Sequence, residues 1–315
     1  MARINPALRE PTFEAVRLHE PIGPVHVVAD EHYLRQGAFA LDDYSAWYFT
    51  GLPNGGGRVV PGAIVARDLV ALFCSVYDPS RVVGLHQKEE VWFHGAIPLG
   101  TTMTYTGRYI DKFERRGKGY VVLECAARDA ADGRLLVRQI STEIMRIPQN
   151  VRLGEGSARP AEGERVEPNW PAGRMPVAEA RADLPAGTPI PPLSKTAYQD
   201  QMSVFSGAGT QWYNIHTDIE VALAAGFRDT LAQGMMETCW MSEMLAAFFG
   251  PGWLTSGHIR MVYLRPVYRG DTITCRAVVR GGAPDAGGMR LHLSVWAENQ
   301  DGVMTAAGWA GALVG

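Results

Sequence analysis

The feature that most constrains this chain is an internal repeat, in which one order of secondary-structure elements occurs twice. Residues 61–74 and 233–249 each form a long apolar segment that begins close to a glycine, Gly62 in the first and Gly234 in the second. Apolar side chains would occupy most of the circumference of a helix there, so both segments are predicted to be buried helices. The repeated unit is far longer than the repeats of solenoid proteins.

Each predicted helix is followed by four predicted strands. Val, Ile, Tyr, Trp and Thr dominate these segments, and glycine-containing turns separate them, among them Asp132-Gly133, Gly281-Gly282 and Asp301-Gly302. The residues around Gly100 also echo those around Gly270. The predicted strands are 87–97, 101–111, 119–129 and 134–146 in the first copy, and 257–268, 271–281, 289–298 and 303–313 in the second.

An antiparallel sheet wrapped around one buried helix is the physical solution for each copy. The predicted fold class is therefore α+β with two such units, whose sheets can join edge to edge and so remove exposed strand edges. The N-terminal unit is predicted to span 1–146 and the C-terminal unit 196–315. Residues 147–195 are rich in Pro, Gly, Glu and Arg and lack a helical or strand period, which predicts a connector.

Composition and charge exclude several classes of protein. Hydrophobic residues make up 46% of the chain and charged residues 20%, which is typical of a soluble globular protein. A formal net charge of −3 without a basic cluster argues against nucleic acid as a partner. No segment has the run of about 20 apolar residues that a membrane span needs, and the first residues lack the apolar core of a secretion signal. Four widely spaced cysteines without metal-ligand spacing favour a reducing cytoplasm and predict no metal site.

Motifs in the second copy carry the chemistry. The segment from Phe205 to Asp218 ends in Ile215-His216-Thr217-Asp218, and Gln233-Gly234-Met235-Met236 follows downstream. In their order these motifs resemble the MaoC-like (R)-specific enoyl-thioester hydratase/dehydratase family, which has a Ser-Gly-Asp-x-Asn-Pro-Ile-His loop, a short helix and a His-Gly-Met entry to its hot-dog helix. The resemblance covers residues 205–270 well and the N-terminal half more loosely. It implies two fused hot-dog units, a double hot-dog, with the catalytic residues in one half.

The resemblance places His216 at the family's catalytic position, but the chain departs from the family pattern at Gln211. Family members carry an Asp there, which holds and activates water together with the His. An amide can orient water or substrate, but it cannot accept a proton at neutral pH. General acid/base chemistry is therefore expected mainly from His216, whose unperturbed pKa suits that role.

The start of the second predicted helix has a mechanical role in this interpretation. A helix N-terminus presents free backbone N–H groups, and Gly234 would let a thioester carbonyl approach them closely. In the family's fold this arrangement stabilises negative charge on the carbonyl oxygen. The candidate catalytic residues are thus His216, Gln211 and Gly234, and the candidate substrate-binding residues are Tyr213, Asn214, Trp212, Met235 and Arg58.

Some of these residues have equally plausible structural roles. Asn214 suits a loop turn, and Thr217 or Asp218 suits the N-cap of a short helix around 219–225. Trp212 and Tyr213 fit core packing as well as an acyl pocket. The loop before Gly62 contains no His or carboxylate, so the N-terminal unit is predicted to shape the acyl pocket without catalytic residues.

The expected function is a lyase that hydrates an enoyl thioester or dehydrates a 3-hydroxyacyl thioester. The resemblance implies no cofactor beyond the coenzyme A or acyl carrier protein that carries the substrate, and it leaves homo-oligomer formation open. A hot-dog acyl thioesterase is one alternative, because Glu237 and Glu243 lie on the predicted central helix. A non-hydrating protein that binds a thioester or promotes a conjugate-addition cyclisation is another, favoured by Gln211.

Overall fold

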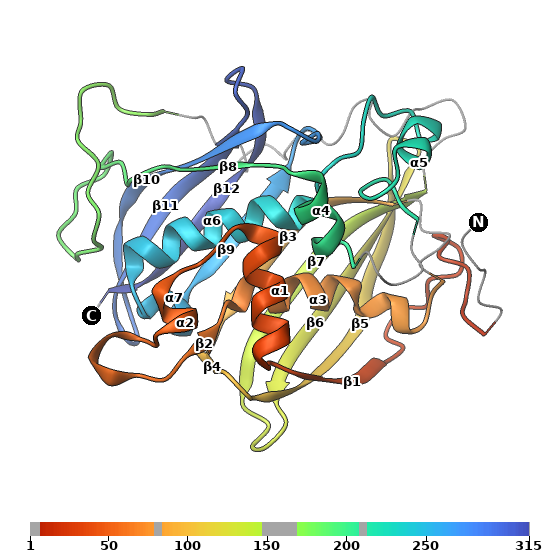
Figure 1. Ribbon diagram of the computed structural model, residues 1–315, viewed down its shortest axis with the longest axis horizontal. Coiled ribbons are helices and arrows are strands. Elements are labelled where there is room, and N and C mark those ends of the chain that lie inside the picture. Colours follow the sequence, from red (N-terminus) through yellow and green to blue (C-terminus); the bar gives the residue numbers. More distant parts are fainter. Residues whose placement is uncertain (1–6, 79–83, 147–168, 208–212, 315) are drawn as a thin grey trace.

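One antiparallel sheet of ten strands spans the computed structural model, which describes residues 7–78, 84–146, 169–207 and 213–314 (Figure 1). The first five strands of the sheet, β1-β5-β6-β7-β3, come from the N-terminal half of the chain. The other five, β9-β12-β11-β10-β8, come from the C-terminal half. Strands β2 and β4 pair separately. The strands are β1 Ile22–Val28, β2 Val59–Val60, β3 Leu85–Phe93, β4 Ile97–Pro98, β5 Thr102–Arg115, β6 Lys118–Asp129, β7 Leu135–Arg146, β8 Leu193–Thr196, β9 His258–Tyr263, β10 Thr272–Asp285, β11 Gly288–Glu298 and β12 Met304–Val314.

The two halves of the sheet meet where β3 pairs with β9, and a pseudo-two-fold axis relates them there. From this junction outwards the strand order is β3-β7-β6-β5-β1 on one side and β9-β12-β11-β10-β8 on the other. Glu90 pairs with Arg260, which lies 170 residues later, and Gly100 and Gly270 have the same separation. Because the pair at the junction has the spacing of the repeat itself, the axis passes between Glu90 and Arg260. The predicted edge-to-edge joining of two units is confirmed.

Two long helices occupy the same face of the sheet, one for each unit (Figure 1). The second, α6, is buried at all but three of its positions, in agreement with an apolar pattern that covers its whole circumference. Both predicted central helices are confirmed and begin at Gly62 and Gly234. The helices are α1 Glu31–Leu41, α2 Ala46–Phe49, α3 Gly62–Ala71, α4 Gln199–Phe205, α5 Ile219–Ala224, α6 Gly234–Phe249 and α7 Gly252–Ser256, with short 3₁₀ turns η1 Pro53–Gly55 and η2 Leu72–Ser75.

The glycine turns are only partly as predicted. Gly133 and Gly302 adopt positive φ angles of 74° and 69°, as tight turns between strands require. Gly281-Gly282, predicted as a turn, instead lies inside β10, where the register with β11 shifts between Val279 and Gly281. The glycine there accommodates a β-bulge, and the chain reverses only after Asp285.

The last residues of the predicted connector belong to the sheet. Strand β8 begins at Leu193 and pairs with β10 at its outer edge. Before it, the Gly187 N–H donates to the Val279 carbonyl oxygen at 2.8 Å, and the Ile190 N–H donates to that of Ala277 at 3.2 Å. The segment from 187 to 196 therefore covers the edge of the C-terminal sheet. Residues 147–168 of the connector lie outside the described part of the chain.

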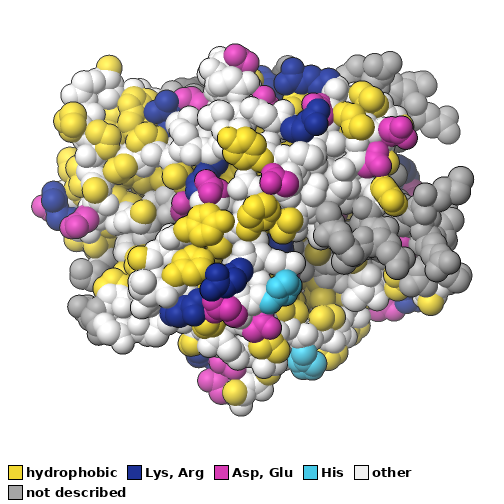
Figure 2. Space-filling model, viewed as in Figure 1, with side chains coloured by type: hydrophobic (Ala, Val, Ile, Leu, Met, Phe, Trp, Pro, Cys, Tyr) yellow, Lys and Arg dark blue, Asp and Glu magenta, His cyan; other side chains and the backbone are white. Residues whose placement is uncertain are grey.

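On the face shown in Figure 2, Lys and Arg side chains lie beside Asp and Glu side chains, so this face has no patch of a single charge. None of the helices in the described part of the chain is long and apolar enough to cross a membrane. All four cysteines are free thiols, and three of them are buried.

Candidate functional site

The loop that carries His216 is shaped by Asn214. The Asn214 side-chain oxygen accepts the backbone N–H of His216 at 2.8 Å, and its carbonyl oxygen accepts the N–H groups of Thr217 and Asp218. Asp218 then caps α5, since its carboxylate accepts the N–H of Glu220 at 2.8 Å. The turn and capping roles that the sequence offered for Asn214 and Asp218 are confirmed, because short polar side chains bond readily to nearby backbone.

The side chain of His216 is half-buried and held in one tautomer. Its Nδ1 lies 2.7 Å from the carbonyl oxygen of Leu231, which can only accept a hydrogen bond, so Nδ1 carries the proton. Burial lowers the pKa of His216 to about 4, although the bond to Leu231 opposes this shift. The ring is therefore neutral at pH 7, and its Nε2, which has no hydrogen-bond partner among the described residues, keeps a lone pair that can accept a proton.

The same contacts bring His216 to the start of α6. The Leu231 N–H donates to the Ile215 carbonyl oxygen at 3.3 Å, while the Leu231 carbonyl oxygen accepts from the His216 ring. The loop with His216 and the segment before α6 are therefore joined by two hydrogen bonds. Leu231 precedes Gly234 by only three residues. Among the described residues no side chain caps α6; the N–H groups of Gly234 and Met235 have no acceptor within the helix, whereas that of Met236 donates to the Gln233 carbonyl oxygen at 2.9 Å. Hydrogen bonds through Leu231 thus hold His216 close to the start of α6.

Gly234 has a packing role that the sequence did not indicate. A Cβ atom at this position would lie 2.8 Å from the ring of Tyr263, which packs directly on the backbone. At the start of α3, a Cβ on Gly62 would lie 2.7 Å from the ring of Phe93. Each central helix therefore begins with a glycine beneath an aromatic ring of the neighbouring strand, and close aromatic packing alone requires glycine at both positions.

Two supporting residues escaped prediction. Gln199 on α4 donates from its side-chain amide to the His216 carbonyl oxygen at 3.0 Å. The hydroxyl of Thr230 donates to the other side-chain atom of the same amide, Gln199 Oε1, at 2.5 Å. Gln199 and Thr230 together hold the backbone of His216 in place. No motif marks them, because Gln199 bonds to a backbone atom that every residue type possesses.

The remaining candidates, the catalytic candidate Gln211 and the predicted substrate-binding residues, are only partly brought together. Gln211 and Trp212 lie outside the described residues. Tyr213 is 55% exposed, so the predicted core packing of its side chain is wrong. Met235 is buried at the start of α6, where its sulfur accepts a weak bond from the Tyr263 hydroxyl at 3.6 Å.

Arg58 does not lie in the His216 site, so that prediction is wrong. It directly precedes β2 at the lower left of Figure 1, whereas α5 lies at the upper right. Its guanidinium donates to the Tyr48 carbonyl oxygen at 2.7 Å and pairs with Glu31 at 2.9 Å. A guanidinium prefers such bidentate protein partners where they are available.

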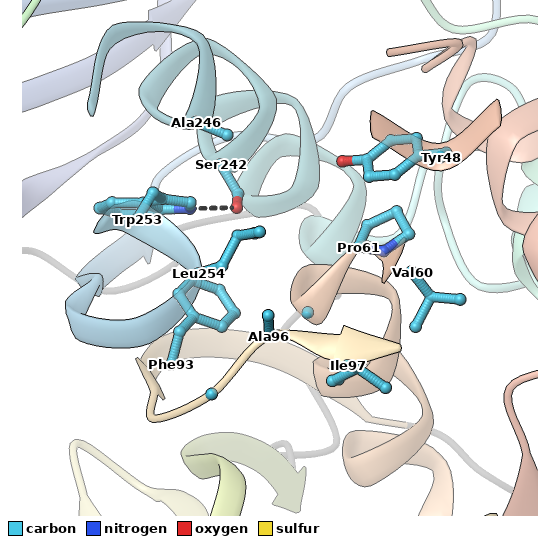
Figure 3. Close-up of a pocket in the computed structure, with 12 residues that line it drawn as sticks. Tyr48, Val60, Pro61, Phe93, Ala96, Ile97, Ser242, Ala246, Trp253 and Leu254 are labelled. Atoms are coloured by element: carbon cyan, nitrogen blue, oxygen red, sulfur yellow. Dashed lines mark hydrogen bonds between the residues drawn. The ribbon is translucent and has the colours of Figure 1, made fainter. Parts of the chain in front are cut away.

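A cavity lies at the start of α3, the counterpart of the His216 site in the N-terminal unit. Figure 3 shows Tyr48, Phe93, Trp253 and Leu254 around it, with Ser242 entering from α6. The Ser242 hydroxyl accepts the indole N–H of Trp253 at 2.8 Å. The lining is mostly apolar, and the space is about that of a water molecule. The sequence also predicts an acyl pocket where His216 and the start of the 234–249 helix face the N-terminal unit; because residues 208–212 beside it lie outside the described part of the chain, that pocket stays a prediction.

The two glutamates of α6 are both shielded. Glu237 is 2% exposed, burial raises its pKa to about 8, and it accepts the hydroxyl of Thr305 at 2.5 Å. Glu243 pairs with Lys195 at 3.0 Å, and burial raises its pKa to about 7. Glu237 is thus neutral at pH 7 and without access to solvent. Among the described residues, no group of three His, Cys, Asp or Glu side chains is placed to hold a metal ion.

The tautomer and low pKa of His216 predict a distinctive titration. By ¹H–¹⁵N NMR, with His216→Gln to assign the signal, the ring is expected to stay neutral and Nδ1-protonated until the pH falls to about 4. Since an unfolded histidine titrates near about 6.5, stability contributed by neutral His216 is complete above that pH. It is lost as the pH falls towards the folded value. A midpoint near that of free histidine would contradict the buried, anchored geometry.

Comparisons with known proteins bear on the fold and on the C-terminal half of the chain. Residues 181–291 match the family model described as the MaoC like domain. No curated protein matches the chain. A solved structure described as a MaoC-like dehydratase is 17% identical, with a TM-score of 0.74 over 96% of this chain and 100% of that one.

Two further solved structures are similar over nearly their full length. A putative MaoC domain protein dehydratase from Chloroflexus aurantiacus is 14% identical, with a TM-score of 0.70 over 99% of this chain and 98% of that one. A conserved hypothetical protein from Mycobacterium tuberculosis, described as having a double hotdog fold, is 13% identical, with a TM-score of 0.65 over 96% and 98%. At such identities the likeness establishes the fold, and the family model adds the domain. The chain has a double hot-dog fold, and its residues 181–291 match the MaoC like domain.

Proposed function

We propose that the protein is a lyase that adds water to an enoyl thioester or, in reverse, dehydrates a 3-hydroxyacyl thioester. The observation that carries the proposal is the neutral His216, whose Nδ1 is anchored to Leu231 while Nε2 has no partner in the part of the chain that the structure describes. The MaoC-like domain supports the reaction class. The thioester carrier is proposed to be coenzyme A or an acyl carrier protein, and the free cysteines suit a reducing cytoplasm.

Hydration requires a group that accepts a proton from water and a group that stabilises charge on the carbonyl oxygen, and the site has a candidate for each. Nε2 of His216 can take a proton from water as the water oxygen bonds to C3 of the enoyl group. Electrons of the C2–C3 double bond move to the thioester carbonyl, where the first N–H groups of α6 can stabilise the oxyanion. Gln211 is proposed to orient the water through its amide. These steps leave C2 in need of a proton.

A thioesterase is a weaker candidate. Its reaction would require a carboxylate on the central helix as base or nucleophile. Glu237 is buried and uncharged at neutral pH, and Glu243 is engaged by Lys195. A neutral carboxyl group is a poor base and a poor nucleophile.

The proposal is tested by offering the purified protein crotonyl-coenzyme A, a branched enoyl thioester and a saturated acyl thioester. Reversible loss of enoyl absorbance, without release of free thiol, is the expected result. Thiol release from the saturated thioester would instead identify a thioesterase. If the native protein hydrates none of them but Gln211→Asp does, the lyase assignment is rejected, and a binding or cyclising role on the same fold remains.

A further inference from the structure

A row of polar side chains is buried on the inner face of β3 and β7, beneath the central helices. Glu89 is fully buried, and Gln139 and Ser141 are each 1% exposed. Glu89 Oε1, Gln139 Oε1 and Ser141 Oγ lack hydrogen-bond partners in the part of the chain that the structure describes. Buried polar groups without partners are rare and usually mark a functional site or bound water. This row belongs to the N-terminal unit, in which the sequence indicated no catalytic residue.

A histidine stands at the end of this row. His86 Nε2 lies 2.8 Å from Glu89 Oε2 and 3.0 Å from the Lys88 carbonyl oxygen, so Nε2 carries a proton that these acceptors hold. Its Nδ1 has no hydrogen-bond partner among the described residues. The imidazole ring rests edge-on against Tyr263, with 5.0 Å between ring centroids. Glu89 therefore orients the ring and leaves Nδ1 available.

His86 faces the same helix start as His216. The Tyr263 ring that it touches packs on Gly234, and the Tyr263 hydroxyl bonds to Thr238 at 2.7 Å. Leu85, the residue before His86, packs in one small apolar cluster with Ile215, the residue before His216. Strands β3 and β9 form the centre of the sheet. The two histidines thus approach the start of α6 from different units.

We infer that His86, oriented by Glu89, is the second proton-transfer residue of this site and donates a proton to C2 of the thioester during hydration. The inference rests on the proposed lyase function and supplies the step that His216 and Gln211 leave open. A neutral His216 can accept the proton of water, and an amide at 211 can give none. The enolate formed at C1–C2 still requires a donor.

The proton balance of the cycle is complete. His216 Nε2 takes a proton from water, and the hydroxyl oxygen bonds to C3. The π electrons pass to the carbonyl oxygen and return to form the C2–H bond with the Nδ1 proton of His86, which starts the cycle protonated on both ring nitrogens. His86 is left neutral with its Nε2 proton still held by Glu89. The proton on His216 then returns to His86 through solvent, and dehydration runs in reverse.

The electrostatic surroundings keep a proton on this pair. Burial lowers the pKa of His86, but the hydrogen bond and charge of Glu89, together with the charge of Glu143 on β7, raise it overall. Burial has the opposite effect on Glu89 and raises its pKa, and the hydrogen bond and charge of His86 partly oppose that rise. Tyr263 on β9 faces the ring as an uncharged phenol, because burial raises its pKa well above the usual value. These surroundings favour the protonated form of His86.

The test compares His86→Gln with His258→Gln in the full-length protein. His258 is a matched control, because its Nε2 bonds to Glu90 at 2.9 Å at the same β3–β9 junction, where alternate residues point to the opposite face of the sheet. His86→Gln is expected to lower kcat for enoyl-thioester hydration by about 10²-fold or more, with little change in KM. His258→Gln is expected to keep the native rate.

Glu89→Gln gives a second readout, the pH dependence of the rate, which would not change if His86 and Glu89 had only a structural role. The amide keeps the size of the side chain and removes its charge, so the pKa of His86 falls and the alkaline limb of the pH–rate profile moves to lower pH. An active native protein with an unchanged rate in His86→Gln, or an unmoved limb in Glu89→Gln, overturns the inference and leaves the lyase assignment intact. A native protein that hydrates no thioester overturns both.

Discussion

His216→Ala is expected to lower the rate of enoyl-thioester hydration by about 10²–10⁴-fold, the usual contribution of a positioned acid/base group. The substitution removes the only atom placed to accept the water proton in the described C-terminal loop, His216 Nε2. The loop itself is held by Asn214 and Gln199 through backbone atoms of residue 216, which alanine retains. Stopped-flow or steady-state absorbance at the enoyl band measures the loss.

The control for this substitution is His292→Ala, which truncates an exposed histidine on β11. It is expected to leave the rate unchanged. Melting temperatures of both variants show whether the loop has been disturbed. A His216→Ala protein that is stable and hydrates at the native rate would remove His216 from the mechanism.

The fold was predictable because the apolar helix pattern and the strand pattern that follows it are both long, and both occur twice in the sequence. The apolar circumference of 234–249 has no interpretation other than a buried helix, and Gly100 and Gly270 set the repeat spacing that the β3–β9 register reproduces. The strands at the sheet edges were missed. Strand β1 contains a Gly-Pro pair, and β8 has four residues after a proline-rich run, so neither shows a clear period of two.

The site was predictable only where a motif marks it. His216 lies in such a motif, but its proton position depends on the Leu231 carbonyl oxygen, a backbone atom that no residue type reveals. The His86–Glu89 pair lies 130 residues before His216 and carries no motif. The pairing of β3 with β9 brings the His86–Glu89 pair close to α6. Positions in the sequence do not show that a residue of the N-terminal unit contributes to a site in the C-terminal unit. The prediction that Arg58 binds substrate was wrong for the same reason, because the fold of the N-terminal unit places Arg58 away from His216.

The largest expected effect on stability comes from Gly308→Ala on β12, the strand next to β9 in the C-terminal unit. Gly308 on β12 pairs with Met261 of β9, and an added Cβ would lie only 1.8 Å from the carbonyl oxygen of Arg260. A methyl group cannot be accommodated there without moving the backbone beside the pseudo-two-fold axis. Overpacking of this kind costs about 3 kcal/mol, which corresponds to a fall in melting temperature of about 5 °C for a chain of this length.

Gly57→Ala is the matched control for Gly308→Ala, because a Cβ there meets no atom within 4 Å and its φ is not positive. It is expected to leave the melting temperature unchanged, as measured by circular dichroism or calorimetry. Since β9 carries Tyr263 and contacts β3, the strain in Gly308→Ala should also displace Tyr263 from the start of α6 and reduce hydration. Equal melting temperatures for the two variants would mean that β12 and β9 are not packed as closely as the strand register requires.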